Sequence, residues 1–290
     1  MIEPRLHDIA CSSPAGRHRM AYWEWGDPNA SQVLICVHGL TRTGRDFDVL
    51  ARRLSARYRV ICPDMVGSGK SGWLADPAFY TVQQYAADLM SLVAHLAPTR
   101  LAWVGTSLGG LVGLAVAGAI ALDKLVLNDV GPHLPLAALS RIGLYTGEPA
   151  RFASLAEAGA YMRETATPFG EHTDAQWDAL AQHVYRQEGE HWVKHYDLGI
   201  AGPFAQYDPA AMAAGELLLW QAFESLICTV LIVRGTQSDL LTQETVHEMM
   251  RRQPRGRLLE VPNVGHAPTL MKDSQLDPVT RFLLDDQGVR

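Results

Sequence analysis

One stretch of this sequence constrains the fold more than any other. A strand-like apolar run, 101–104, leads into Gly105-Thr106-Ser107-Leu108-Gly109, and a helical run of small residues follows over 111–121. A strand that turns directly into a helix holds the residue between them on a sharp bend, where side chains at both glycines would collide. The pattern predicts Ser107 as an exposed nucleophile at the carboxyl edge of a sheet, with a tight helix-packing turn as the alternative. The Leu108 N–H, in the first helical turn, is then a predicted oxyanion donor.

Strands and helices alternate around this stretch. The continuous apolar run over 33–37 is typical of a strand covered by helices on both faces, and further strands are predicted over 59–62, 101–104 and 124–128. Between them, 46–58 and 81–96 carry apolar residues at helical spacing. Residues 5–12 and 18–25 alternate like two antiparallel strands around a turn at Pro14-Ala15-Gly16. This order predicts an α/β protein with a mostly parallel, doubly wound sheet, whose ligands bind at the carboxyl ends of the strands.

The rhythm changes after Pro132. From 133 to 222 the segments are aromatic-rich and mostly helical, including 153–165 and 174–187, without a convincing strand core. A stretch of this length is too long for a loop, so we expect a helical lid inserted over the active site. The sheet resumes at 229–234 and 258–261, with helices over 242–252 and 277–285. The predicted organisation is therefore a core of residues 1–132 and 223–290 with an insert of residues 133–222.

Three side chains that suit acyl transfer each follow a strand of the predicted core. Ser107 follows one strand, Asp239 lies in the loop Gly235-Thr236-Gln237-Ser238-Asp239 after a later strand, and His266 follows the last. Serine is a poor nucleophile at neutral pH, so His266 is predicted to accept and return its proton, and Asp239 to orient the imidazole. Asp129 competes for the acid role, because it also ends a strand at the catalytic edge.

These residues and their order resemble the α/β-hydrolase family, over essentially the whole chain. His38-Gly39 is similar to the family's oxyanion-loop motif, Gly105 to Gly109 to its nucleophile elbow, Ser238-Asp239 to its acid loop and Gly265-His266 to its base loop. The resemblance implies about eight strands with helices on both faces, and the Leu40 N–H as the second oxyanion donor. It also leaves Asp129 open as the acid, since some members draw their acid from that position.

The resemblance narrows the chemistry to that of a serine hydrolase. Family dehalogenases and epoxide hydrolases carry aspartate at the elbow, where this chain has Ser107. We favour hydrolysis of a small to medium carboxylic ester through an acyl-enzyme, with a short hydroxyalkanoate oligomer as one such substrate. Arg42, just behind the oxyanion loop, either contacts a substrate carboxylate or caps a helix. The alternatives are carbon–carbon hydrolysis of ring-cleavage dioxo acids and a ligand-binding receptor of the same fold.

Composition bears on partners and compartment. A net charge of −6 over 290 residues argues against nucleic-acid or anionic-membrane partners, and no apolar segment reaches the length of a membrane span. We see no secretory signal, and the four cysteines lack C-x-x-C spacing, which favours buried free thiols in the cytoplasm. The sequence predicts a small-molecule ester substrate, no metal and no organic cofactor, and it leaves the oligomeric state open.

Overall fold

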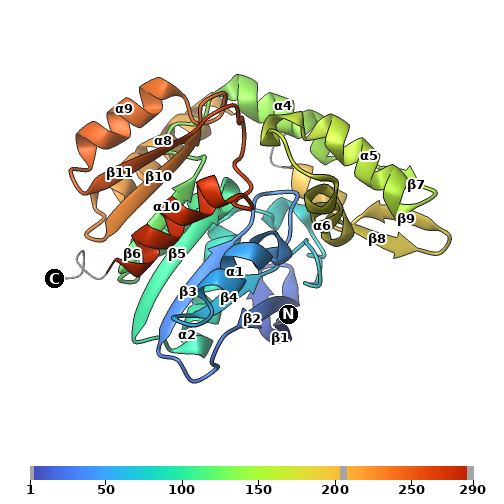
Figure 1. Cartoon of the computed structure of the whole chain (residues 1–290), viewed down its shortest axis with the longest axis horizontal. Helices are drawn as coiled ribbons and strands as arrows, with labels where there is room; N and C mark the ends of the chain where they lie inside the picture. The colour runs from blue at the N-terminus through green and yellow to red at the C-terminus, as the bar shows by residue number, and fades with distance from the viewer. Residues whose placement is uncertain (1–2, 203–207, 286–290) are drawn as a thin grey trace.

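A central sheet with helices on both faces organises the molecule (Figure 1). The structure is a computed structural model that describes residues 3–202 and 208–285. Within these residues the main sheet has eight strands in the order β1-β2-β4-β3-β5-β6-β10-β11. The strands are β1 (Arg5–Ser13), β2 (Gly16–Trp25), β3 (Gln32–Val37), β4 (Arg59–Pro63), β5 (Arg100–Thr106), β6 (Lys124–Asn128), β10 (Thr229–Gly235) and β11 (Gly256–Val261).

The sheet is mostly parallel, which confirms the predicted fold class. β1 and β2 form an antiparallel hairpin, β2 runs antiparallel to β4, and the remaining neighbours are parallel. The strands β3, β5, β6 and β10 lie next to one another, so their carboxyl ends meet at one edge. The residues that follow β5 and β6 are therefore brought together by the topology.

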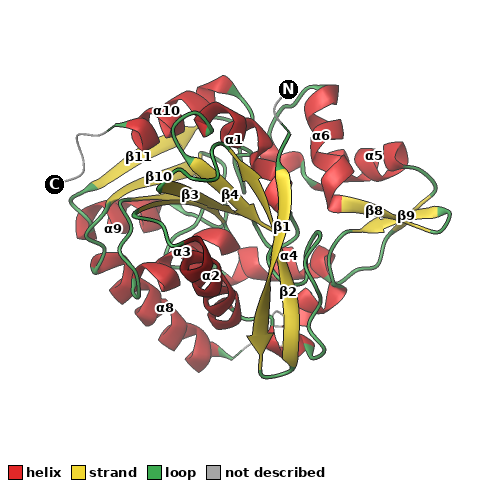
Figure 2. Ribbon diagram, turned by 90° about the horizontal axis from the view of Figure 1, so that it is seen from below, coloured by secondary structure: helices red, strands yellow, loops and turns green. Residues whose placement is uncertain are grey.

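Two hydrophobic cores cover the two faces of the sheet (Figure 2). One face packs on α1 and α10, with Leu50 and Phe282 in its core. The other packs on α2, α3, α8 and α9, with Leu89 and Phe223 in its core. These helices are α1 (Asp48–Leu54), α2 (Val82–Leu96), α3 (Leu108–Ala117), α8 (Pro209–Glu224), α9 (Gln243–Arg252) and α10 (Asp273–Leu284).

Residues 136–201, which we call the cap segment, lie over the carboxyl edge of the sheet (Figure 1). They form α4 (Leu136–Thr146), β7 (Arg151–Phe152), α5 (Leu155–Thr165), η3 (Thr167–Phe169), α6 (Asp174–Val184), β8 (Tyr185–Glu188), β9 (His191–Lys194) and η4 (Leu198–Ala201). The expectation of no strand core in this region is wrong, because β7, β9 and β8 form a three-stranded antiparallel sheet.

Two details of the predicted insert differ from the structure for local reasons. The helix expected over 174–187 ends at Val184, and the chain continues as the β8–β9 hairpin, whose turn contains Gly189 at φ 61°. Glycine adopts such a positive φ at little cost. Helix α8, also expected within the insert, packs against α3 and contributes Trp220 and Phe223 to the core.

The structure bears on two expectations from composition, the state of the cysteines and the absence of a membrane-spanning helix. Cys11, Cys36, Cys62 and Cys228 are free and buried, which confirms the prediction of buried thiols. Among the helices of residues 3–202 and 208–285, none combines the length and apolar character that a membrane crossing needs.

Candidate active site

The turn between β5 and α3 has the strained geometry that its glycines predict. Ser107 adopts φ 52° and ψ −118°, outside the regions that non-glycine residues normally occupy. A Cβ atom on Gly109 would lie 2.1 Å from the Val37 carbonyl oxygen, and one on Gly105 would lie 2.3 Å from the Gly109 carbonyl oxygen. Both glycines are therefore required by close backbone contacts, and they present Ser107 at the end of the strand.

Ser107, His266 and Asp129 form a hydrogen-bonded series. His266 Nε2 lies 2.9 Å from Ser107 Oγ, and His266 Nδ1 lies 2.8 Å from Asp129 Oδ2. An ionised carboxylate only accepts hydrogen bonds, so Nδ1 carries the proton and Nε2 faces the serine hydroxyl as an acceptor. The Asp129 side chain is fully buried and that of His266 is 10% exposed. The arrangement can remove the serine proton during attack on a carbonyl carbon.

The predicted acid, Asp239, is not part of this series, and its expected contact with His266 is wrong. Asp129 follows β6 at φ 57°, and its N–H donates to Val233 O of β10 at 2.7 Å, which leaves its side chain facing the base loop. Asp239 lies beyond the end of β10, and its carboxylate accepts two hydrogen bonds from Arg141 of α4, both at 2.7 Å. These bonds hold the pKa of Asp239 below its ordinary value.

The loop that carries Asp239 nevertheless supports the acid. Ser238 Oγ donates to Asp129 Oδ2 at 2.6 Å, and the Gly235 N–H donates to Oδ1 at 2.8 Å. Ser238 Oγ in turn accepts the Leu241 N–H at 3.0 Å. Both oxygens of the Asp129 carboxylate are thus held in place by hydrogen bonds from this loop. This contact of Ser238 was not predicted from the sequence, because the loop was expected to supply the acid itself.

The two predicted oxyanion donors belong to segments that adjoin Ser107. Leu108 opens α3, where its N–H has no intrahelical acceptor. Leu40 belongs to a turn closed by the Arg42 N–H to Gly39 O bond of 3.1 Å, and a Cβ on Gly39 would lie 3.6 Å from Ser107 Cβ. Within the described residues, neither the Leu40 nor the Leu108 N–H donates to a protein acceptor. Both are therefore available to a developing oxyanion.

His38 holds this oxyanion loop in place. Its Nε2 accepts the Met65 N–H at 2.9 Å, so its proton is on Nδ1, which donates to Gly39 O at 2.7 Å. The ring is completely buried, and desolvation lowers the pKa of His38 below 6.5. A neutral imidazole with both nitrogens occupied supports the loop and takes no part in proton transfer.

Asn128, at the end of β6, links the elbow to the base loop. Its Nδ2 donates to Thr106 Oγ1 at 2.9 Å and to Pro268 O at 2.8 Å, and its carbonyl accepts the Ser107 N–H at 2.9 Å. No local sequence pattern predicted this role, because its partners lie on two other segments of the chain, the elbow and the base loop.

A cavity between the cap segment and the core opens onto His266. The core contributes Thr41 and Arg42, and the cap segment contributes most of the wall. Its cap residues are Arg141, Tyr145, Tyr161, Met162, Thr165, Ala166, Pro168, Phe169, Val184, Tyr185, Lys194 and Tyr196. The wall is thus mainly aromatic and apolar with a few cationic groups, which suits a small ester.

Arg42 lines this cavity, but much of its guanidinium is occupied. Its Nε and Nη2 donate to the Asp46 carboxylate at 2.6 and 2.9 Å, and its Nη1 lies 4.0 Å from Met162 Sδ. The contact of Arg42 with a substrate carboxylate stays a prediction. Because Nε and Nη2 already donate to Asp46, fewer N–H groups of Arg42 remain for such a contact.

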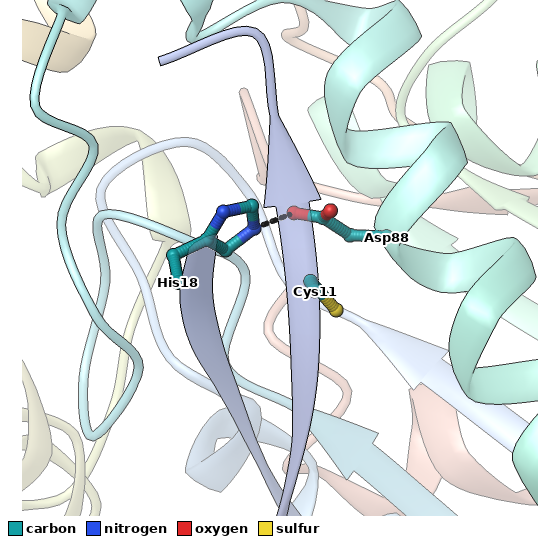
Figure 3. A group of neighbouring side chains, drawn as sticks. All are labelled: Cys11, His18 and Asp88. Carbon is teal, nitrogen blue, oxygen red and sulfur yellow. Dashed lines mark hydrogen bonds and ion pairs between the residues drawn. The ribbon is translucent and has the colours of Figure 1, made fainter. Parts of the chain in front are cut away.

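A group of zinc-ligand residue types lies where the β1–β2 hairpin meets α2 (Figure 3). Ligand atoms of Cys11 on β1, His18 on β2 and Asp88 on α2 lie within 4.8 Å of one another. Hydrogen bonds already engage the carboxylate: His18 Nε2 lies 2.8 Å from Asp88 Oδ2, and Gln84 Nε2 donates to Oδ1 at 2.8 Å. Burial raises the pKa of Cys11 to about 12, which disfavours a thiolate ligand. We interpret the group as a polar contact that joins the β1–β2 hairpin to α2.

Comparisons with known proteins agree with this geometry. A family model described as the alpha/beta hydrolase family matches residues 34–280. The chain is 49% identical over 285 residues to a 3-hydroxybutyrate-oligomer hydrolase of Cupriavidus necator, covering 96% of this chain and 97% of that protein. It is 28% identical over 277 residues to an esterase of Mycobacterium tuberculosis, covering 90% and 85% respectively.

A solved structure extends the likeness to three dimensions. The crystal structure of an alpha/beta hydrolase from Novosphingobium aromaticivorans superposes with a TM-score of 0.83 at 32% identity. The match covers 98% of this chain and 99% of that chain, so it includes the cap segment as well as the core.

Proposed function

The chain belongs to the alpha/beta hydrolase family and is a carboxylic ester hydrolase, and from this premise we propose that it cleaves short oligomers of 3-hydroxybutyrate through an acyl-enzyme on Ser107. One observation carries the proposal: His266, which is hydrogen-bonded to Ser107 and Asp129, lines a small, mainly aromatic and apolar cavity. The extensive identity to the oligomer hydrolase supports the choice of substrate.

The first half of the reaction forms the acyl-enzyme. Ser107 Oγ attacks the ester carbonyl carbon while His266 Nε2 takes the hydroxyl proton, and Asp129 stabilises the imidazolium. The Leu40 and Leu108 N–H groups bind the oxyanion of the tetrahedral intermediate. When this intermediate collapses, the ester C–O bond breaks and His266 returns the proton to the leaving hydroxyl group.

The second half restores the enzyme. A water molecule gives a proton to His266, and its oxygen attacks the acyl carbon. The bond from Ser107 Oγ to that carbon then breaks, and the serine oxygen takes back the proton. The products are two hydroxy acids, or a hydroxy acid and a shorter oligomer.

Two measurements test the function. We expect the purified protein to release 3-hydroxybutyrate from its dimer and trimer, and to leave a coloured ring-cleavage dienoate unchanged. Turnover of the dienoate without turnover of any ester would favour the carbon–carbon alternative, which these relatives do not favour.

Active-site labelling tests the nucleophile separately. Treatment with a small fluorophosphonate should add one adduct to the parent protein, detected by intact mass, and none to Ser107→Ala. Ser91→Ala is the matched control, because Ser91 is an exposed serine on α2 whose hydroxyl donates to Ala87 O. An adduct that survives in Ser107→Ala would overturn the assignment.

We also place the enzyme in the cytoplasm. Four buried free thiols suit a reducing compartment, where disulfides are rare. A cell fractionation with antibody detection tests this placement, and recovery in the culture medium would contradict it.

A further inference from the structure

Three cationic side chains line the active-site cavity, and they differ in how their charge is balanced. Arg42 forms two hydrogen bonds with the Asp46 carboxylate, and Arg141 forms two with Asp239. Lys194 is the third. Within residues 3–202 and 208–285, no carboxylate forms an ion pair with it.

The Lys194 ammonium is buried in this position. The residue is 8% exposed, and its Nζ donates to Tyr145 O and Glu148 O, both at 2.7 Å. An ammonium has three N–H donors, so these two bonds leave one. Desolvation lowers the pKa of Lys194 to about 8, although the Glu148 charge opposes the shift. A buried cation without a negative partner is costly, and an anionic ligand in the cavity would supply that partner.

We propose that Lys194 binds the free carboxylate of the substrate and so selects oligoesters with an acid end over neutral esters. The inference rests on the proposed function, because a linear hydroxy-acid oligomer has one carboxylate at its acid end and neutral esters elsewhere. Lys194 is then a specificity-determining residue that holds the acid end while Ser107 attacks an ester carbonyl.

The alternative is a purely structural role, in which Lys194 only binds carbonyl groups at the end of α4. Its two carbonyl partners lie at or just beyond the C-terminus of α4, where cations stabilise a helix. Lys124 does the same elsewhere: its Nζ donates to Phe282 O and Leu283 O at the C-terminus of α10. Lys124 does not line the active-site cavity, so it provides a matched control for loss of such carbonyl contacts.

The experiment compares one substrate in two charge states. The trimer of 3-hydroxybutyrate is supplied as the free acid and as its methyl ester, and kcat/KM is measured for both. We expect the parent enzyme to prefer the acid by about tenfold to a hundredfold, the usual range for a hydrogen bond to a charged group. Lys194→Met should reduce this ratio to about one, mainly through a higher KM for the acid, with little change for the methyl ester.

Further variants separate charge from structure. Lys194→Gln retains N–H donors for the carbonyls but removes the charge, so it should lose the preference as Lys194→Met does. Lys194→Arg should keep part of it. Lys124→Met and Arg186→Gln, which changes a cap cation outside this cavity, should keep the parent ratio.

Each outcome decides a specific point. A parent enzyme that treats acid and methyl ester alike overturns the inference, as does a preference that survives in Lys194→Gln. If p-nitrophenyl butyrate is hydrolysed but neither form of the trimer is, the proposed oligoester function fails instead. Should Lys194→Met not fold, Lys194→Gln and Lys194→Arg still decide the role of the charge.

Discussion

Replacing Asp129 with asparagine changes one atom and tests which carboxylate orients the base. In the parent protein Oδ1 accepts the Gly235 N–H, whereas Oδ2 accepts from Ser238 and His266. An asparagine would keep its oxygen toward the Gly235 N–H, because its NH2 group cannot accept that bond. The NH2 group then faces His266 Nδ1, which must become the acceptor. The imidazole proton moves to Nε2 and faces Ser107, so the ring can no longer act as a base.

The change of imidazole tautomer determines the size of the loss in kcat. The wrong tautomer reduces kcat by about 10⁴, which corresponds to about 5.5 kcal/mol at 1.36 kcal/mol per tenfold. Asp239→Asn removes an ion pair with Arg141 in which the two side chains are 48% and 38% exposed. Such pairs contribute about 0–1 kcal/mol, so we expect at most about a fivefold change.

The assay is hydrolysis of p-nitrophenyl butyrate by both variants, with circular dichroism to verify that each is folded. Arg141→Gln is the matched control, since it breaks the same ion pair as Asp239→Asn from the other side. The reasoning is refuted if Asp239→Asn loses as much activity as Asp129→Asn, or if Asp129→Asn keeps more than about a tenth of the parent kcat.

Two further predictions concern the elbow and the oxyanion loop. Gly109→Ala should lower the free energy of unfolding by on the order of 3 kcal/mol, because its Cβ would lie 2.1 Å from Val37 O. Gly118→Ala is the control and should not lower it, because a Cβ there meets only one atom, at 3.6 Å. Urea denaturation measures both. His38→Leu leaves the Met65 N–H without its acceptor at a cost of about 1–3 kcal/mol, and a variant as stable as the parent would contradict this. Burial lowers the pKa of His38 below 6.5, so below that pH the unfolded chain binds a proton that the folded chain does not. The free energy of unfolding should therefore fall as the pH drops below about 6.5. It should fall less steeply in His38→Leu, which lacks this group.

Features of the site that depend on neighbouring residues could be predicted from the sequence. The Gly105 to Gly109 turn is specified by the steric needs of a strand that enters a helix, and the structure places both glycines against backbone atoms. His38 lies in the oxyanion loop that the resemblance indicated, and its Nδ1 donates to Gly39 O of the same loop. In these cases the functional residue and the residues that hold it in position are neighbours in the sequence.

The carboxylate that contacts His266 could not be predicted in this way. Asp129 and Asp239 both follow strands that end at the catalytic edge, so strand order alone does not separate them. The distinction depends on the bond from the Asp129 N–H to Val233 O and on the presence of Arg141 opposite Asp239. Both contacts join segments about a hundred residues apart in the sequence, beyond the reach of any local pattern.

The residues that are hydrogen-bonded to one another at the site and the residues that form the cavity wall come from different parts of the chain. Ser107, Asp129, Ser238 and His266 all lie on the core, and in the described part of the chain the hydrogen bonds that join them include no cap residue. Most of the cavity wall, in contrast, comes from the cap segment. Because Asp239 is not bound to the base, its carboxylate is available to Arg141 and connects the two parts. Changes in the cap segment can therefore alter which esters fit while the proton-transfer geometry stays fixed by strands β5, β6 and β10.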